Sequence, residues 1–153
     1  MSRIQLALNV SNVDEAVAFY EKLFGTPPAK RRPGYANFAI AEPPLKLVLF
    51  ENPGAESRLN HLGVEVADRA LVADTQRRLA AEGVETADGS GTCCFAEQDK
   101  VWVDAPDGAW EIYAVLADSE TFGEDRRRSD AEAAAVCCSG GVDTAEAGSV
   151  CCG

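Results

Sequence analysis

The stretch RIQLALNV at residues 3–10 has a counterpart in HLGVEV at residues 61–66, about 56 positions further along the chain. Both stretches alternate apolar and polar side chains, which is the period of a β-strand with one buried face. The apolar faces consist of Ile4, Leu6, Leu8 and Val10 in the first stretch and of Leu62, Val64 and Val66 in the second. The opposite faces carry Gln5, Ala7 and Asn9, and His61, Gly63 and Glu65. Gln5 and His61 therefore hold matched positions in two related strands.

A helix and further strands are expected after each of these stretches. The first helix can be capped by Asn12 or Ser11 and should end at Gly25. Its apolar stripe is expected to consist of Ala16, Phe19, Tyr20 and Leu23. The second helix is expected at about residues 70–82, before Gly83. The remaining strand candidates are residues 35–41 and 45–51 in the first half, and 92–98, 100–105 and 110–116 in the second.

This repeated order predicts an α+β fold of two βαβββ modules, at about residues 2–51 and 60–117, within one domain over residues 1–117. The helix of each module can cover only one face of its sheet, and the aliphatic face of each first strand is expected to bury it. The other faces must point toward a shared space. The two modules should therefore form a cup-shaped mixed sheet, with Gln5 and His61 facing into the cup.

Residues 118–153 are expected to form a disordered tail. They are rich in Ala, Glu, Asp, Gly and Ser and contain almost no large apolar residue after Phe122. Such a segment cannot bury enough apolar surface to offset the entropy of ordering it.

The net charge and the composition of the chain argue against some classes of binding partner. The formal net charge of −11 argues against nucleic acid and anionic membrane surfaces, because both require basic patches. No signal-peptide pattern and no apolar run of roughly 18 residues is found. A cytoplasmic location is expected, where thiols stay reduced.

All six cysteines occur as adjacent pairs: Cys93 and Cys94, Cys137 and Cys138, and Cys151 and Cys152. Neighbouring cysteines are poor disulfide partners, so the pattern favours thiol chemistry with a soft metal or metalloid. The alternative for Cys93 and Cys94 is a pair of small buried apolar side chains. Adjacent side chains on a regular strand point to opposite faces. Joint action of the two thiols therefore requires residues 88–94, DGSGTCC, to form a flexible loop.

His61 is the only histidine in the chain. By residue type alone, a single histidine is more often a surface or hydrogen-bonded side chain than a ligand. Here it opens a strand, faces the expected cup and is matched by Gln5. Glu111 lies on the face of its strand opposite Ile112, where a carboxylate is costly unless it meets water, a cation or a donor. Gln5, His61 and Glu111 could hold a metal and leave positions open, similar to the facial arrangement of non-haem Fe(II) oxygenases.

This layout resembles the vicinal oxygen chelate superfamily, which includes glyoxalase I, extradiol dioxygenases and fosfomycin-resistance proteins. More narrowly, residues 32–51 (RPGYANFAIAEPPLKLVLFE), 60–66 (NHLGVEV) and 92–113 (TCCFAEQDKVWV to WEIY) resemble the ArsI-type carbon–arsenic lyases and the related cadmium-induced CadI proteins. The resemblance covers about residues 2–116. Its specific part is the cysteine pair followed by QDKVWV.

The resemblance implies an enzyme with one Fe(II) held by Gln5, His61 and Glu111, which are then both the metal ligands and the catalytic residues. It implies that Cys93 and Cys94 bind a trivalent organoarsenical such as methylarsenite or a reduced aromatic arsenical. The implied reaction is O2-dependent cleavage of the carbon–arsenic bond, which releases inorganic arsenite.

Two other functions and the assembly stay open at this point. The six thiols are also compatible with a protein that sequesters Cd(II) or As(III) without turnover. Glyoxalase-type isomerase chemistry would need a fourth ligand, and residues 45–51 (LKLVLFE) offer only Leu47 or Lys46 at the matching position. The superfamily layout admits a homodimer, because the cup can be assembled within one chain or by exchange of halves between two.

Overall fold

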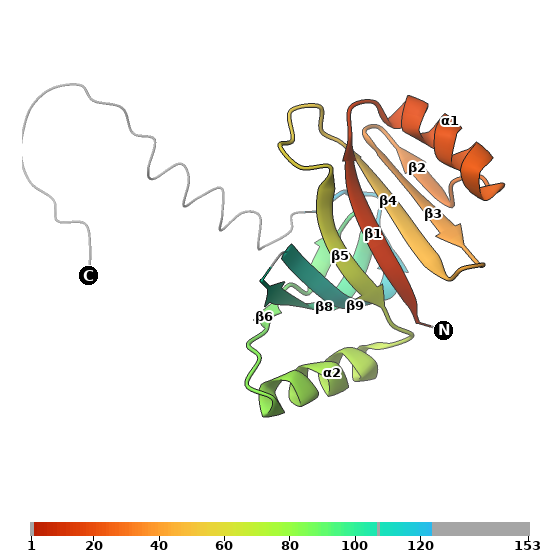
Figure 1. The fold of residues 1–153 in the computed structure, drawn as a ribbon. Helices are drawn as coiled ribbons and strands as arrows, with labels where there is room; N and C mark the ends of the chain where they lie inside the picture. The colour runs from red at the N-terminus through yellow and green to blue at the C-terminus, as the bar shows by residue number, and fades with distance from the viewer. Residues whose placement is uncertain (1, 107, 124–153) are drawn as a thin grey trace, which may run out of the picture.

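The chain repeats one order of elements twice (Figure 1). The computed structural model describes residues 2–106 and 108–123. The first module consists of β1 (Arg3–Val10), α1 (Val13–Phe24), β2 (Lys30–Arg32), β3 (Tyr35–Ile40) and β4 (Leu45–Glu51). The second consists of β5 (Leu59–Glu65), α2 (Arg69–Ala81), β6 (Ala87–Asp88), β7 (Gly91–Cys93), β8 (Ala96–Ala105) and β9 (Gly108–Asp118).

β1 and β5 join the two modules into one sheet. Within the described residues this sheet has nine strands in the order β2-β3-β4-β1-β5-β9-β8-β6, with β7 paired to β8. β1 is antiparallel to β5, whereas β1 with β4 and β5 with β9 are parallel pairs. The predicted α+β fold is confirmed, since two related modules form one curled, mixed sheet (Figure 1). The first module has the predicted βαβββ order, and the second has one short strand more.

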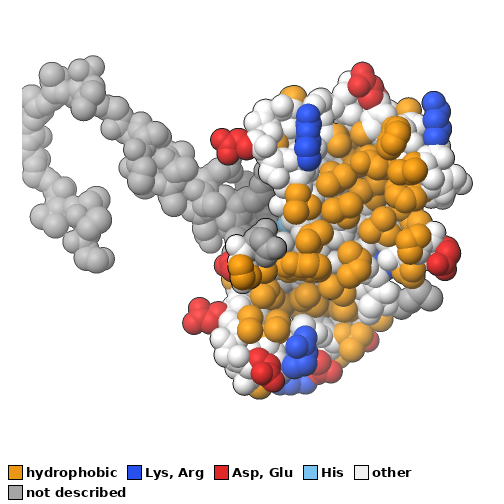
Figure 2. Space-filling model, in the orientation of Figure 1, with side chains coloured by type: hydrophobic (Ala, Val, Ile, Leu, Met, Phe, Trp, Pro, Cys, Tyr) orange, Lys and Arg blue, Asp and Glu red, His pale blue; other side chains and the backbone are white. Residues whose placement is uncertain are grey.

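The two helices lie over later strands than expected. α1 packs against β3 and β4, and α2 packs against β8 and β9. The aliphatic faces of β1 and β5 therefore lie between the helices, where Ile4 and Leu59 are exposed. Figure 2 shows hydrophobic side chains gathered on this face of the molecule. The expectation that each first strand buries its own helix was met only in part. Leu6, Leu8 and Val10 pack against the cluster that contains Val13 and Val17 of α1, and Val66 packs against the cluster that contains Val72 of α2. Each helix nevertheless lies mainly over an outer part of its module.

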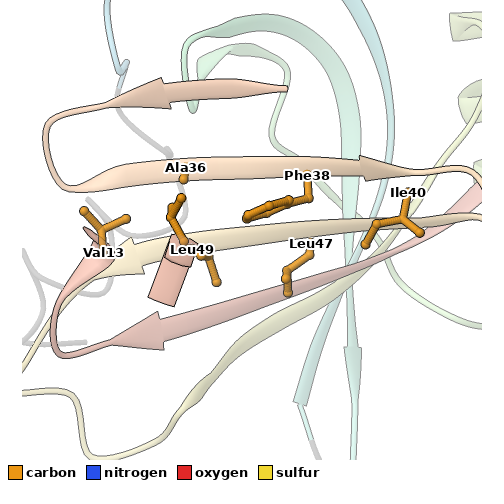
Figure 3. Packing of buried hydrophobic residues seen from close by; sticks show 7 residues of the cluster. Val13, Ala36, Phe38, Ile40, Leu47 and Leu49 are labelled. Carbon is orange, nitrogen blue, oxygen red and sulfur yellow. The ribbon is translucent and has the colours of Figure 1, made fainter. Parts of the chain in front are cut away.

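The first module has the larger hydrophobic core. Val13 and Val17 of α1 pack against Phe38 of β3 and against Leu47 and Leu49 of β4 (Figure 3). As expected, the helix begins after Asn12, whose Oδ1 accepts a hydrogen bond from Glu15 N at 3.0 Å, and ends at Gly25 in the left-handed conformation with φ of 64°. The predicted apolar stripe was partly wrong. Ala16 and Tyr20 contact the core, but Phe19 and Leu23 are 59% and 58% exposed, and Val13, Val17 and Phe24 take their place.

The domain continues beyond residue 117, where the disordered tail was expected to begin. β9 ends at Asp118, and Ser119 N donates a hydrogen bond to Phe95 O at 3.0 Å. The Phe122 ring lies 5.4 Å from the Phe95 ring and 6.1 Å from the Phe50 ring, so this last large apolar side chain completes an aromatic cluster. The rest of the expected tail, with Cys137, Cys138, Cys151 and Cys152, lies outside the described residues.

Neither helix in the described part of the chain has the length and apolar character that crossing a lipid bilayer requires.

Candidate active site

The sheet register brings Gln5 and Glu111 together on either side of Gly63. Gln5 of β1 is opposite Gly63 of β5, and Gly63 is opposite Glu111 of β9. His61 comes two residues before Gly63 on β5, so its side chain leaves the same face of the sheet. Gln5 and Glu111 are each only 4% exposed. The three side chains therefore meet on one buried face, although they come from three different strands.

Gly63 is required for this close approach. A Cβ atom at position 63 would lie 2.9 Å from Glu111 Cγ, 3.2 Å from Glu111 O and 3.4 Å from Gln5 Cβ. The absence of a side chain at this position allows the flanking side chains to converge.

Gly63→Ala is expected to lower the affinity for a divalent metal by about tenfold or more, because the new methyl group displaces Glu111 and Gln5. The measurement is calorimetric titration of the metal-free protein with Zn(II). Gly54→Ala is the matched control, since a Cβ atom at Gly54 meets nothing within 4 Å. Equal affinities in the two variants would contradict this role of Gly63.

A chain of amide side chains fixes the orientation of the His61 ring. Asn9 Nδ2 donates to Ser57 O at 2.9 Å, and Asn9 Oδ1 accepts from Asn60 Nδ2 at 2.9 Å. Asn60 Oδ1 therefore faces His61 Nδ1, at 2.8 Å, and takes the Nδ1 proton. The lone pair of His61 Nε2 is left pointing toward Gln5 and Glu111, which is the orientation that a metal-ligating histidine needs.

The donor atoms of the three residues are in mutual contact. Gln5 Nε2 lies 3.1 Å from His61 Nε2 and also donates a hydrogen bond to Glu111 Oε1. His61 Nε2 and Glu111 Oε1 are 3.2 Å apart. The N–H groups of Gln5 thus place partial positive charge between an imidazole lone pair and a carboxylate oxygen.

Lys100 neutralises the other oxygen of Glu111. Its side chain is 1% exposed, and Nζ lies 3.3 Å from Glu111 Oε2. Burial alone would raise the pKa of the Glu111 carboxyl, but the Lys100 ammonium group and the hydrogen bond donated by Gln5 oppose burial, and the pKa is lowered to about 2. Glu111 is therefore a carboxylate at neutral pH and keeps Oε1 directed toward Gln5 and His61.

These residues fit a divalent transition metal. An imidazole nitrogen, a carboxylate oxygen and an amide oxygen are donors that iron and related metals accept. No cluster of three histidine, cysteine or carboxylate side chains is found among residues 2–106 and 108–123, so a metal here depends on the amide of Gln5. The buried position that the Gln5 N–H groups now hold between two electron-rich atoms is one that a cation could occupy.

The Cys93 and Cys94 thiols lie on the same side of the chain because a tight turn follows β7. Cys93 is the last residue of β7 and pairs with Ala96 of β8. Cys94 and Phe95 connect the two strands with φ of 55° and 61°. This two-residue turn of left-handed conformation normally uses residues such as Asn-Gly. The two Sγ atoms are 3.1 Å apart, and neither cysteine forms a disulfide.

The prediction of a flexible loop at residues 88–94 was wrong, although the two thiols still lie on the same side of the chain. Asp88 belongs to β6, and Gly91–Cys93 form β7 with hydrogen bonds to β8. From Gly91 onward the chain leaves strand geometry only at Cys94, after the first thiol, and this is enough to end the alternation of side chains.

Contacts around Phe95 hold the turn in place. Its carbonyl oxygen accepts hydrogen bonds from Lys30 Nζ at 2.8 Å and from Ser119 N at 3.0 Å. Its ring lies 5.3 Å from the Tyr35 ring. These contacts offset the cost of left-handed backbone at non-glycine residues, about 1–3 kcal/mol each.

Cys94 shares a cavity of about 290 Å³ with the three candidate metal ligands. The lining includes Gln5, His61, Glu111 and Cys94 together with Gln98 and the aromatic side chains of Tyr35 and Phe50. Gln98 is 6% exposed, and its Oε1 has no hydrogen-bond partner among the described residues. The cavity therefore brings the Cys94 thiol, the candidate ligands and a buried acceptor into one space.

The Cys94 thiol is held in its protonated form. The hydrogen bond with Cys93, burial, and the nearby charges of Cys93 and Glu111 raise its pKa well above the ordinary value. Because the thiolate is the nucleophile, alkylation of Cys94 by iodoacetamide at pH 7.5 is expected to be slower than that of N-acetylcysteine in the same tube.

The rate at Cys94, read by mass spectrometry of its peptide, should rise steeply with pH, because the raised pKa postpones ionisation to alkaline solution. Faster alkylation of Cys94 than of the model thiol at pH 7.5 would contradict the raised pKa.

The sequence analysis assigned no contact in the site to three residues: Lys100; Glu65, which it placed only on the same strand face as His61; and Tyr113, for which a place in the core was preferred over one in the lining of the cup. Lys100 follows Gln98 and precedes Trp102 on one face of β8, and all three are buried. That alternation was a readable signal for a lysine directed inward. The contact of Tyr113 with Gln5 and that of Glu65 with Tyr113 had no such signal, because they depend on the pairing of β1, β5 and β9.

Comparison with known proteins agrees with this fold. The family model of the Glyoxalase/Bleomycin resistance protein/Dioxygenase superfamily matches residues 3–111, and the chain belongs to this superfamily. It is 58% identical over 125 residues to the trivalent organoarsenical cleaving enzyme of Thermomonospora curvata, covering 80% of this chain and 83% of that one. It is 56% identical over 152 residues to the cadmium-induced protein CadI of Mycobacterium tuberculosis, covering 97% of this chain and 100% of the relative.

Among solved structures, the 2,3-dioxygenase LapB of Pseudomonas sp. KL28 superposes with a TM-score of 0.54. Its sequence identity is 19%, over 80% of this chain and 43% of that one, so the likeness concerns the fold alone.

Proposed function

We propose that this protein is an Fe(II)- and O2-dependent enzyme that cleaves the carbon–arsenic bond of trivalent organoarsenicals, such as methylarsenite and reduced aromatic arsenicals, and releases inorganic arsenite. The observation that carries the proposal is the Cys94 thiol, 3.1 Å from its neighbour Cys93, in the same cavity as Gln5, His61 and Glu111. Relatives named as trivalent organoarsenical cleaving enzymes support it, at 58% and 35% identity.

The thiol pair suits a trivalent arsenical. A compound R–As(OH)2 and two thiols condense to two arsenic–sulfur bonds with release of two water molecules, so protonated thiols are the correct reactants. If each arsenic–sulfur bond is about as long as a zinc–thiolate bond, ~2.3 Å, the observed Sγ separation corresponds to an S–As–S angle of roughly 85°. Such an angle fits a pyramidal trivalent atom, whose third bond then carries the organic group.

Gln5, His61 and Glu111 would hold the metal on the inner face of the sheet. Fe(II), when bound, would supply the O2 chemistry that carbon–arsenic cleavage requires. The chain itself separates two kinds of ligand, because thiolates prefer the soft arsenic while imidazole and oxygen donors suit the harder iron. Aromatic side chains around Cys94, including Tyr35 and Phe50, would exclude water from the organic group.

The experiment is anaerobic loading of the protein with Fe(II), addition of methylarsenite, and then admission of air. Inorganic arsenite, separated by chromatography and quantified by its arsenic content, is the expected product. Absence of arsenite after air is admitted would refute the proposal, and arsenite formed equally without O2 would refute its oxygen dependence.

A second candidate is sequestration of Cd(II) or As(III) without turnover. It is favoured by the pairing of all six cysteines and by the likeness to the cadmium-induced proteins. Serine substitution of Cys137, Cys138, Cys151 and Cys152 in the full chain separates the two functions. A lyase keeps its rate of arsenite release, whereas a sequestering protein loses most of its binding capacity.

A further inference from the structure

We infer that Glu65 and Tyr113 are positioning residues that turn the side-chain amide of Gln5 so that its carbonyl oxygen faces the metal. This inference rests on the metal site of the proposed function. It assigns a role to two residues that would not touch the metal themselves.

The Gln5 amide can point two ways, related by a half-turn about its Cγ–Cδ bond. In the structure Nε2 faces His61 and Glu111, while Oε1 accepts a hydrogen bond from Tyr113 OH at 2.5 Å. An amide binds a metal through its oxygen, because the nitrogen lone pair is delocalised into the carbonyl group. The metal-binding form of the site therefore needs the opposite orientation.

The surroundings of Tyr113 favour that opposite orientation. The phenol is fully buried, and its oxygen lies 2.5 Å from Gln5 Oε1 and 3.0 Å from Glu65 Oε2. A phenol has one proton and cannot fully satisfy two acceptors. With the amide turned, Tyr113 OH donates to Glu65, and the phenol oxygen accepts from Gln5 Nε2. The Tyr113 hydroxyl and the Gln5 amide nitrogen then donate to different acceptors, Glu65 and the phenol oxygen.

Glu65 is fixed as a charged acceptor. Arg3 Nη2 lies 2.8 Å from its Oε1, and Lys46 Nζ lies 2.9 Å from its Oε2. Although burial raises the pKa of the Glu65 carboxyl, Lys46 and Arg3 lower it overall, so it remains an acceptor for Tyr113. A neutral amide in its place could donate to the phenol oxygen, and Tyr113 would then donate to Gln5 Oε1 and hold it away from the metal.

Turning the amide also changes the other side of Gln5. Oε1 then faces His61 Nε2 and Glu111 Oε1, and three electron-rich atoms meet without a proton between them. A cation relieves this repulsion. The amide nitrogen is thus directed inward when no metal is present and outward when one binds, and the Tyr113–Glu65 pair reduces the cost of the second arrangement.

The first test observes the Gln5 amide directly, with Zn(II) as a diamagnetic probe. In the unmodified protein, the 15N-detected side-chain NH2 signal of Gln5 is expected to move on Zn(II) binding and to show a hydrogen bond to Tyr113. An NH2 signal that stays unchanged while the His61 signals move would overturn the inference.

The second test compares Zn(II) affinities by calorimetry. Glu65→Gln and Tyr113→Phe are each expected to weaken Zn(II) binding by about 10–100-fold, the range for outer-shell partners of a metal site. Asp14→Asn is the matched control, because it also turns a carboxylate into an amide and removes an ion pair, with Arg31, but at an exposed position outside the site, and it should change the affinity by no more than about twofold. An equal loss in Asp14→Asn would indicate a general effect of charge and overturn the inference.

A Gln5→Glu variant tests the positioning role in another way. The two oxygens of a carboxylate are equivalent, so the side chain at position 5 then presents an oxygen to the metal in either orientation. Adding Glu65→Gln in this background is expected to cause no loss of Zn(II) affinity, and a loss as large as in the Gln5 background would count against the positioning role. Unchanged affinity in His61→Ala and Glu111→Gln would instead refute the metal site itself. A site that needs His61 and Glu111 but not Glu65 would refute only this inference.

Discussion

Replacing Glu111 with glutamine is expected to abolish metal-dependent activity and to destabilise the metal-free protein. The substitution removes the only anionic member of the candidate ligand set, so the loss of Zn(II) affinity should exceed the ~10–100-fold typical of an outer-shell change. It also removes the carboxylate next to the buried Lys100. Breaking a buried ion pair from one side costs about 3 kcal/mol, measured as the free energy of unfolding in urea.

The double variant Glu111→Gln/Lys100→Met separates these two effects. Most of the lost free energy of unfolding should return, because both charges are gone, whereas metal binding should remain absent. A Glu111→Gln variant that still binds Zn(II) like the unmodified protein would rule out Glu111 as a ligand. A double variant no more stable than Glu111→Gln would show that Lys100 does not depend on this carboxylate.

Because the pKa of Glu111 is lowered in the folded protein, the free energy of unfolding measured in urea should depend on pH. Its carboxyl has a pKa of about 2 in the folded protein, below the ordinary value of 4.5. The stability that this group contributes is therefore complete above pH 4.5 and is lost as the pH falls toward 2. Urea unfolding of the metal-free protein at pH 5 and pH 3 should show this loss, and the double variant should show less of it.

A Cys93→Ser/Cys94→Ser variant is expected to keep its metal affinity within about twofold, because the thiols are not part of the ligand set. Its release of arsenite from methylarsenite should fall by about 10²-fold or more, since the substrate is no longer held in place. Hydroxyl groups are hard ligands and do not replace thiols toward trivalent arsenic. The measurement is the rate of arsenite release at saturating Fe(II) and O2.

Two kinds of variant serve as controls for this experiment: single serine substitutions at Cys93 or Cys94, and serine substitution of the four cysteines beyond residue 123. Cys93→Ser or Cys94→Ser alone leaves one arsenic–sulfur bond, so each should bind methylarsenite more weakly than the pair, which gains from the high effective concentration of its second thiol. The serine variant of Cys137, Cys138, Cys151 and Cys152 should retain the full rate. An unchanged rate in the Cys93→Ser/Cys94→Ser variant would place arsenical binding elsewhere in the chain.

In both predictions the cavity contains two sites with different chemistry. The thiol pair at the turn after β7 accepts a soft metalloid, and the row Gln5–Gly63–Glu111 with His61 accepts a harder cation. Loss of one site should leave binding at the other intact. Independent loss of each binding activity would support a protein that brings two ions together in one cavity.

Local sequence patterns predicted much of this fold. Alternation in residues 3–10 and 61–66 identified β1 and β5, and their repetition identified two βαβββ modules. Asn12 and Gly25 marked the ends of α1 because capping depends on a few neighbouring residues. The same patterns placed Gln5 and His61 on the inner face, and the structure brings both into contact with Glu111. Their role as metal ligands stays a prediction.

Errors arose where the answer depended on neighbours distant in sequence. Phe19 and Leu23 are apolar but exposed, because the position of α1 over β3 and β4 decides which helix face is buried. The turn at Cys94 and Phe95 carries no glycine or asparagine, and contacts from Lys30 and Ser119 help to hold it. No local pattern reports such contacts.

The sequence by itself therefore determined both helices, most of the long strands and the face on which each candidate side chain lies, because period and capping are properties of a few adjacent residues. It did not indicate the short strands β2 and β6, and the strand predicted at residues 92–98 is divided between β7, a turn and β8. Only the tertiary structure decided which of those side chains meet. The strand register places Gly63 between Gln5 and Glu111, and the burial of Lys100 pairs it with that carboxylate. Tyr113 contacts both Gln5 and Glu65. Each of these contacts joins separate strands, and the pairing that creates it forms only when the whole sheet does.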